Sequence, residues 1–248
     1  MIDILITTYN RKEFLIKTIE SVFEKTKNMD FRLFIIDDCS KDGTQDYLRN
    51  LEHEKLVCVR LSKMRNGIVP SFNILWNEVR FYDRFFEQKE YLCYLQDDCV
   101  ILRDGWLWIL LSAYEKLKEK CDIGFFSAYD APEHPVRQKV KLDGEEILLK
   151  DSQTATNLIA TKSFWKSIND DDGEVPKKNP DRSERGFPNN GKGSQIDLYW
   201  TGCKSGSQFI PRAAASGCSF IQKKKIMVIP MIEHLGRSHK ESTWRGSR

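Results

Sequence analysis

The first half of the chain alternates short apolar runs with segments of helical periodicity, and this alternation limits the possible folds more than any other feature. Four β-branched or apolar runs have the composition and length of buried strands: residues 2–8, 31–36, 56–61 and 91–96. The segments 11–25 and 70–86 between them carry apolar residues at helical spacing. Strands that alternate with helices predict βαβ units and a parallel sheet.

The intervening helices have recognisable ends and faces. Asn10 is a favourable N-cap residue, and we expect it to cap helix 11–25 together with Glu13 three positions later. Pro70 suits the first turn of helix 70–86, whose inward face would carry Phe72, Trp76, Val79 and Phe86.

The second half of the chain is less regular. We expect a helix at 105–120, strands at 123–127 and 154–160, a short helix at 162–168, the start of a helix at 196–201 and strand character at 219–229. Residues 129–151 contain two prolines and a DG turn, so they predict a loop or a hairpin with weak strands. Residues 169–193 suit either a mobile lid or a disordered segment.

Two adjacent carboxylates, Asp97 and Asp98, follow the apolar run 91–96. Ionised carboxylates at the end of a buried strand are costly unless a cation or hydrogen bonds offset their charge. Mg²⁺ typically takes one or two carboxylates together with phosphate oxygens, so a divalent cation that holds a substrate phosphate accounts for the pair. The structural alternative is a pair of turn-forming, helix-capping aspartates.

Polar groups also follow the first two strands. Thr8 and Tyr9 end the first run, and Asp37 and Asp38 end the second. Because the carboxyl ends of parallel strands meet at one edge of a sheet, these residues should converge with Asp97 on a ligand crevice. Neither a GxGxxG nor a GxxxxGK[ST] pattern occurs, which disfavours a Rossmann dinucleotide site and a P-loop.

The bulk properties are those of a soluble globular protein. A length of 248 residues allows one large domain, and the net charge of +3 is too small to indicate nucleic acid binding by itself. Seven cysteines without a CxxC pair, and the lack of a signal peptide, favour a reducing cytoplasmic setting. No apolar run reaches the roughly 18 residues of a membrane span, although peripheral membrane contact stays open.

Four segments follow one another in the order ILITTYNRKEFLIKTIESVF, FIIDDCSKDGT, NGIVPSFN and YLQDDCV. Together they resemble the nucleotide-sugar half of a family 2 glycosyltransferase with the GT-A fold. The resemblance covers residues 1–130 well and the remainder loosely. It implies a nucleotide-diphosphate sugar donor and a Mn²⁺ or Mg²⁺ ion on the aspartate motif. It also implies one GT-A-like α/β domain with a mostly parallel, twisted sheet flanked by helices. The nucleotide-sugar half would be 1–130, and the acceptor half and tail 131–248.

The same resemblance assigns donor-side roles residue by residue. Thr8 and Tyr9 would frame the nucleobase, and Asp38, with Asp37 beside it, would accept hydrogen bonds from the base or ribose. The donor-site contacts of similar proteins fall on two further positions, Arg65 and Asn66.

For the metal, Asp97 would lie near the ribose or the ion, and Asp98 would contact the ion. The family usually has an acid two positions before the last aspartate, where this chain has Gln96. His234, in the segment IEHLGRSH, resembles C-terminal segments that return a histidine to the metal. A structural or solvated histidine is the alternative for His234.

The acceptor side resembles the family less closely. Gln195 stands where relatives commonly place the general base, which leaves Asp197 as the nearby candidate. Asp197 could equally be a first-turn helix acid that the helix dipole favours.

The expected function is transfer of a sugar to an acceptor hydroxyl, with a glycan or lipid-linked sugar as acceptor. Three alternatives stay open: transfer to modified nucleic acid, a nucleotidyltransferase, and a non-catalytic sugar or nucleic-acid binding module. A nucleotidyltransferase would need a glycine-rich basic loop after the first strand, and ITTYNRKE is not one.

Overall fold

The structure is a computed structural model. It describes residues 2–132, 134–151, 153, 156–167, 198–201, 208–211 and 224–235 of the chain. None of the helices in these ranges combines the length and apolar character needed to cross a bilayer.

The described elements follow the predicted order in the first half of the chain. The helices are α1 (Lys12–Lys25), α2 (Thr44–Arg49), α3 (Ile68–Phe85), α4 (Trp106–Leu117) and α5 (Lys162–Ser167). The first six strands are β1 (Ile2–Thr8), β2 (Phe31–Asp37), β3 (Leu56–Leu61), β4 (Tyr91–Gln96), β5 (Cys99–Ile101) and β6 (Ile123–Ser127). The later strands are β7 (Val136–Leu142), β8 (Glu145–Lys150), β9 (Asn157–Thr161), β10 (Leu198–Thr201), β11 (Gln208–Pro211), β12 (Lys225–Val228) and β13 (Ile232–His234).

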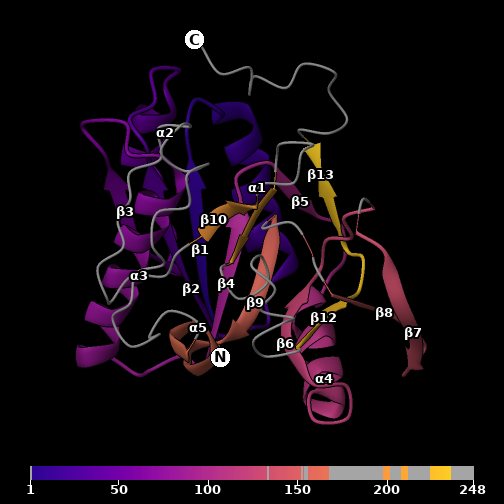
Figure 1. Cartoon of the computed structure of the whole chain (residues 1–248). Coiled ribbons are helices and arrows are strands. Elements are labelled where there is room, and N and C mark those ends of the chain that lie inside the picture. The colour runs from indigo at the N-terminus through magenta and orange to yellow at the C-terminus, as the bar shows by residue number, and fades with distance from the viewer. Residues whose placement is uncertain are drawn as a thin grey trace.

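The main sheet has nine strands in the order β3-β2-β1-β4-β9-β6-β12-β8-β7 (Figure 1). Only β8 and β9 run opposite to the other strands, so the sheet is mostly parallel, as predicted. Two small antiparallel pairs, β10-β11 and β13-β5, stand outside it. The parallel block β3-β2-β1-β4 places the carboxyl ends of β1, β2 and β4 at one edge.

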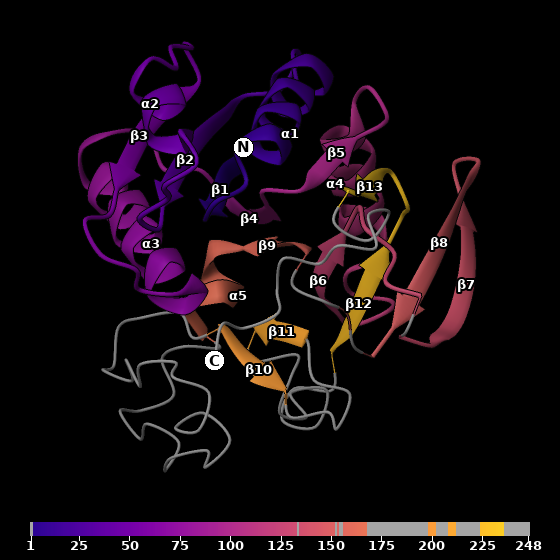
Figure 2. The same ribbon diagram turned by 90° about the horizontal axis from the view of Figure 1, so that it is seen from above.

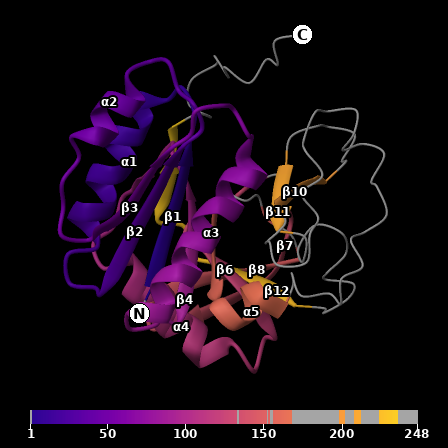
Figure 3. The same cartoon turned by 90° about the vertical axis from the view of Figure 1, so that its left-hand side faces the viewer.

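Helices cover both faces of the sheet (Figure 2). On one face, Leu15 and Ile19 of α1 and Leu110 of α4 belong to one buried cluster with alternate residues of β1 and β2, and α4 lies against β6. On the other face, α3 and α5 bury Phe72 and Trp165, and Figure 3 shows α3 lying along the strands. Strands β1, β2 and β4 are therefore buried on both sides, which explains why their runs are mainly apolar instead of alternating.

Three expectations about local structure were wrong. Asn10 does not cap α1: its backbone has φ 51°, its Oδ1 accepts a hydrogen bond from the Lys41 amide, and the Lys12 amide is bound by Asp42 Oδ2 at 2.9 Å. Residues 198–201 form strand β10 and not a helix. Phe86 ends α3 with its side chain exposed, because the helix stops at Phe85 and the chain becomes extended there.

The segment 129–151 forms the hairpin that its DG turn allowed. Strands β7 and β8 are antiparallel, and Asp143 and Gly144 join them with φ of 52° and 84°. Two consecutive positive φ angles are typical of the type I′ turn that suits a two-residue hairpin loop.

An ionic network closes the amino end of the sheet. Asp3 of β1 is fully buried and accepts two hydrogen bonds from Arg32 of β2, at 2.6 and 2.9 Å. Lys162 of α5 lies 2.6 Å from Asp3 Oδ2, and Asp83 of α3 contacts both cations. The network joins two strands and two helices by charge pairs that are shielded from water.

We predict that Asp3→Asn lowers the free energy of unfolding by about 3 kcal/mol, because it leaves two buried cations with one carboxylate. Urea denaturation measures the change. Asp46→Asn is the matched control, since it breaks the exposed pair with Arg49 and should cost less than about 1 kcal/mol. Equal stability of the two variants would contradict the prediction.

Candidate functional site

The turns that follow β1 and β2 are bound to each other. The Asn10 amide donates to Ser40 Oγ at 2.7 Å, and the Asp38 amide donates to the Thr8 carbonyl at 2.8 Å. These contacts continue the register of the strands, in which Thr8 lies opposite Asp37. The predicted residues Thr8, Asp37 and Asp38 therefore lie together at one edge of the sheet.

Asp38 organises the turn that leads into α3. Its Oδ1 accepts from the Asn66 amide at 2.7 Å, and its Oδ2 accepts from the Gly67 amide at 2.8 Å. Gly67 has φ 89°, a conformation that glycine adopts at little cost. The Arg65 guanidinium, beside this turn, lies 4.3 Å from the centre of the Tyr9 ring. Four of the predicted donor-binding residues thus form one connected group, which consists of Tyr9, Asp38, Arg65 and Asn66.

Asp37 is buried and accepts hydrogen bonds within the protein. Its Oδ2 is bound by the Ser40 amide at 2.9 Å and by Gln45 Nε2 at 2.7 Å. This carboxylate holds the turn between β2 and α2 and supports Asp38 beside it.

Asp97 and Asp98 lie at the carboxyl end of β4, and the Arg11 side chain separates both carboxylates from the solvent. Their residues are 5% and 1% exposed. Arg11 Nη1 donates to Asp98 Oδ2 at 2.6 Å and to Asp97 Oδ1 at 3.2 Å. Burial opposes the charge of Arg11, but the two carboxylates outweigh it and raise the guanidinium pKa. Burial, together with the charge of Asp98, raises the pKa of Asp97 to about 6, although Arg11 acts against this shift.

Helix α1 positions the carboxylate turn through two hydroxyl groups. Thr18 Oγ1 donates to the Asp97 carbonyl at 2.9 Å and accepts from the Cys99 amide at 3.1 Å. Ser21 Oγ accepts from the Ile101 amide at 3.1 Å. Both hydroxyls lie on the helix face that packs on the sheet, so the backbone of the turn is bound where water is excluded.

Strand pairing brings His234 to the carboxylates from the far end of the sequence. In the β13-β5 pair His234 lies opposite Cys99, and the Leu235 amide donates to the Asp98 carbonyl at 2.8 Å. His234 Nε2 lies 3.3 Å from Asp98 Oδ1 and 3.3 Å from Gln96 Oε1. Asp98 therefore faces Arg11 with one oxygen and His234 with the other.

The spacing of His234 Nε2 and Asp98 Oδ1 is compatible with two ligands of one divalent ion. Cis ligands of an octahedral ion with bonds of 2.0–2.1 Å lie about 3 Å apart, close to the spacing of His234 Nε2 and Asp98 Oδ1. Within the part of the chain that the structure describes, no three His, Cys, Asp or Glu side chains gather closely enough to hold an ion alone. Mg²⁺ and Mn²⁺ sites of this type take their remaining ligands from water and substrate phosphate.

One predicted site residue lies outside the described residues. That residue is Asp197. The predictions also missed Arg11, Thr18 and Ser21. A threonine and a serine on the apolar face of helix 11–25 were the available signal, since a polar group on such a face needs a buried partner.

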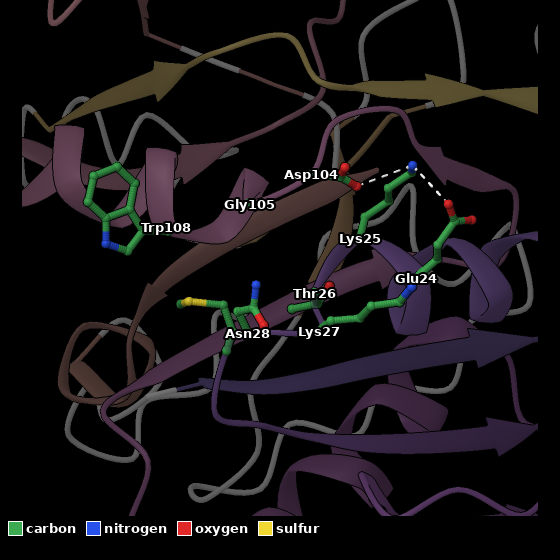
Figure 4. A pocket seen from close by; sticks show the side chains of 9 residues that line it. Glu24, Lys25, Thr26, Lys27, Asn28, Asp104, Gly105 and Trp108 are labelled. Carbon is green, nitrogen blue, oxygen red and sulfur yellow. Dashed lines mark hydrogen bonds and ion pairs between the residues drawn. The ribbon is translucent and has the colours of Figure 1, made fainter.

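A separate cleft of about 410 Å³ lies between the end of α1 and the start of α4 (Figure 4). Lys25, Asp104 and Trp108 are among its lining residues, and Lys25 pairs with Asp104 at 3.2 Å. None of the predicted site residues lines it.

The raised pKa of Asp97 predicts a pH dependence of stability. The folded state holds the Asp97 proton more tightly than the unfolded state, whose carboxyl pKa is about 4, so the neutral form stabilises the fold at low pH. This contribution is lost as pH rises from about 4 to about 6. Relative to Asp97→Asn, the free energy of unfolding of the wild type should therefore fall by up to about 3 kcal/mol between about pH 4 and about pH 6. Denaturant titrations at pH 4, 5, 6 and 7 measure the difference, and a constant difference would refute the assignment.

Comparisons with known proteins identify the family and the fold of the chain. The sequence model of glycosyl transferase family 2 matches residues 3–177. The mannosyltransferase PcManGT from Pyrobaculum calidifontis, solved with GDP-Man and Mn²⁺, has a similar structure at 12% identity and TM-score 0.52, over 92% of this chain and 54% of that one. S. aureus TarS 1–349 with UDP-GlcNAc matches at 14% identity and TM-score 0.47, over 68% of this chain and 47% of that one.

No curated protein matches the chain in sequence. The chain spans about half the length of PcManGT and of TarS 1–349, and 30% of the longer TarS chain. At these identities the structural likeness shows the fold, which is the predicted GT-A-like arrangement. The family match extends over more than half of the chain and includes β1, β2 and β4, whose carboxyl ends carry most of the candidate site. The chain belongs to glycosyl transferase family 2.

Proposed function

We propose that this chain is a glycosyltransferase that moves a sugar from a nucleotide-diphosphate sugar to an acceptor hydroxyl with the help of Mn²⁺ or Mg²⁺. The observation that carries the proposal is the buried pair Asp97–Asp98 beside His234 at the carboxyl end of β4. Such a group is suited to a cation–diphosphate complex. The presence of GDP-Man and Mn²⁺ in PcManGT supports a nucleotide sugar and a divalent ion as ligands here.

The nucleoside would lie against the turns after β1 and β2. Tyr9 offers a ring face that a base can stack on once Arg65 moves aside. The Asn66 Nδ2 donates to Asp38 Oδ1 and to the Met64 carbonyl, so Asn66 would offer its side-chain oxygen to ribose or base. Asp38 would hold these turns in place, since both its carboxylate oxygens accept from protein amides. The Thr8 carbonyl and Asp37 Oδ2 also accept from protein amides, whereas Thr8 Oγ1 and Asp37 Oδ1 would face the nucleoside.

The diphosphate would lie at the carboxylate pair. Asp98 and His234 would hold the divalent ion, and Asp97 would lie beside the ribose or the ion. A bound divalent ion supplies positive charge against the leaving diphosphate. The burial of both carboxylates strengthens such interactions, because little water competes for them.

The acceptor would bind to the half that follows residue 130. We propose residues 1–130 as the donor half and 131–248 as the acceptor half of one domain, with a glycan or lipid-linked sugar as acceptor. Asp197 is the proposed base that takes the proton of the acceptor hydroxyl.

The first experiment measures nucleoside diphosphate release from a panel of nucleotide sugars with Mn²⁺, with Mg²⁺ and with chelator. We expect release that depends on the ion, and a loss of about 10²-fold or more in Asp98→Asn, because charge stabilisation by a metal contributes several kcal/mol. Asp104→Asn, which removes an exposed carboxylate of the separate cleft, is the matched control. Wild-type activity of Asp98→Asn in chelator would contradict the metal role, and a binding module would release nothing above background.

The second experiment tests the proposed base. Removing the carboxylate in Asp197→Asn should lower turnover by roughly 10²–10⁴-fold, the usual size of general-base catalysis, and should leave donor affinity nearly unchanged. The acidic limb of the pH–rate profile should vanish in the variant. If Asp197 is only a first-turn helix acid, the variant keeps its rate and loses about 0.3–1 kcal/mol of stability.

A further inference from the structure

Arg11 occupies a position that the proposed function leaves without a role. It lies in the turn between β1 and α1, and its side chain is 18% exposed. A single nitrogen, Nη1, contacts both carboxylates of the proposed ion site, Asp97 and Asp98. The guanidinium therefore stands where positive charge is needed when no divalent ion is bound.

Among the described residues, Arg11 partly neutralises the negative charge of the Asp97–Asp98 pair. Asp97 and Asp98 carry two negative charges when ionised, and Arg11 carries one positive charge at all physiological pH values. His234 Nε2 also lies 3.3 Å from Asp98 Oδ1. With His234 neutral, the free site has a net charge of about −1, and without Arg11 it would have about −2.

The positive charge of Arg11 opposes ion binding to the free site. A divalent ion that enters the free site meets a fixed cation within a few ångströms, in surroundings where charges are weakly screened. A nucleotide-sugar diphosphate brings two negative charges of its own and reverses the balance in favour of the ion. Both Nη1 hydrogens point to carboxylates, which leaves the Nε and Nη2 hydrogens of Arg11 for phosphate oxygens.

We propose that Arg11 is the resident counter-ion of the Asp97–Asp98 pair and makes the site select a divalent ion together with the diphosphate instead of the ion alone. Arg11 acts through the carboxylates, so it is a positioning residue and not a catalytic one. The inference rests on the proposed function, because that function brings the ion and the diphosphate to this pair.

The test is a Mn²⁺ titration of the protein without any donor, followed by the electron paramagnetic resonance signal of the free ion. Arg11→Gln should bind Mn²⁺ at least about 10-fold more tightly than the wild type, because the competing charge is gone. Lys12→Gln is the matched control: it removes a positive charge one residue away, from a side chain that lies beside Gly43. Its affinity, and that of Arg11→Lys, should stay within about 3-fold of the wild type.

The double variant Arg11→Gln/Asp98→Asn should lose the higher Mn²⁺ affinity of Arg11→Gln. This loss would show that the ion binds at the Asp97–Asp98 pair. A Mn²⁺ affinity of Arg11→Gln no higher than that of Lys12→Gln would overturn the proposal, as would a gain that persists in the double variant. If Arg11→Gln does not fold alone, millimolar Mn²⁺ should restore its circular dichroism by supplying the missing charge. The absence of such recovery would also overturn the proposal.

The outcome is independent of sugar transfer. An unchanged Mn²⁺ affinity in Arg11→Gln, together with ion-dependent release of nucleoside diphosphate by the wild type, would reject the role of Arg11 and keep the proposed function. A higher Mn²⁺ affinity in Arg11→Gln, without release of nucleoside diphosphate by the wild type, would support the role of Arg11 and reject the proposed function.

Discussion

The site depends on one electrostatic constraint, the presence of two adjacent carboxylates at the buried end of β4. Neither aspartate is more than 5% exposed, and ionised groups in such surroundings need compensation by nearby positive charge. Arg11 supplies that charge, at 2.6 Å from Asp98 and 3.2 Å from Asp97. The compensation is partial, since Asp97 still has a raised pKa. The surrounding structure preserves an unfavourable pair of charges, which is the usual condition of a binding site for a cation.

Much of the fold holds this pair in place. Thr18 and Ser21 of α1 bind the backbone around β5, and the β13-β5 pairing sets His234 opposite Cys99. On the other side, the parallel register of β1 and β4 places Thr7 beside Gln96, so the turn that carries Arg11 begins next to the carboxylates. The network around Asp3 closes the opposite end of the same strands.

The sequence was most informative where each element has one strong local signal. The apolar runs predicted β1 to β4 almost to the residue. Strands β1, β2 and β4 are mainly apolar because they are covered on both faces. The parallel order of these strands then predicted that residues after β1, β2 and β4 would meet. The structure brings Thr8 to Asp38 in this way.

Local sequence signals were less informative where contacts between distant residues determine the structure. Asn10 has the chemistry of a helix cap, but the turn after β2 uses it instead and gives the capping role to Asp42. Residues 198–201 form a strand because they pair with β11, a partner that periodicity does not reveal. The contact of Arg11 with Asp97 and Asp98 joins positions 86 and 87 residues apart, and no spacing rule relates them.

The most direct test of the central claim is a crystal structure of the protein with Mn²⁺ and a nucleoside diphosphate, with the ion located by its anomalous scattering. The account predicts a manganese peak within coordination distance of Asp98 and His234, the diphosphate against that ion, and the base beside Tyr9. A nucleotide bound in the cleft between α1 and α4, or a manganese peak away from the carboxylate pair, would contradict it.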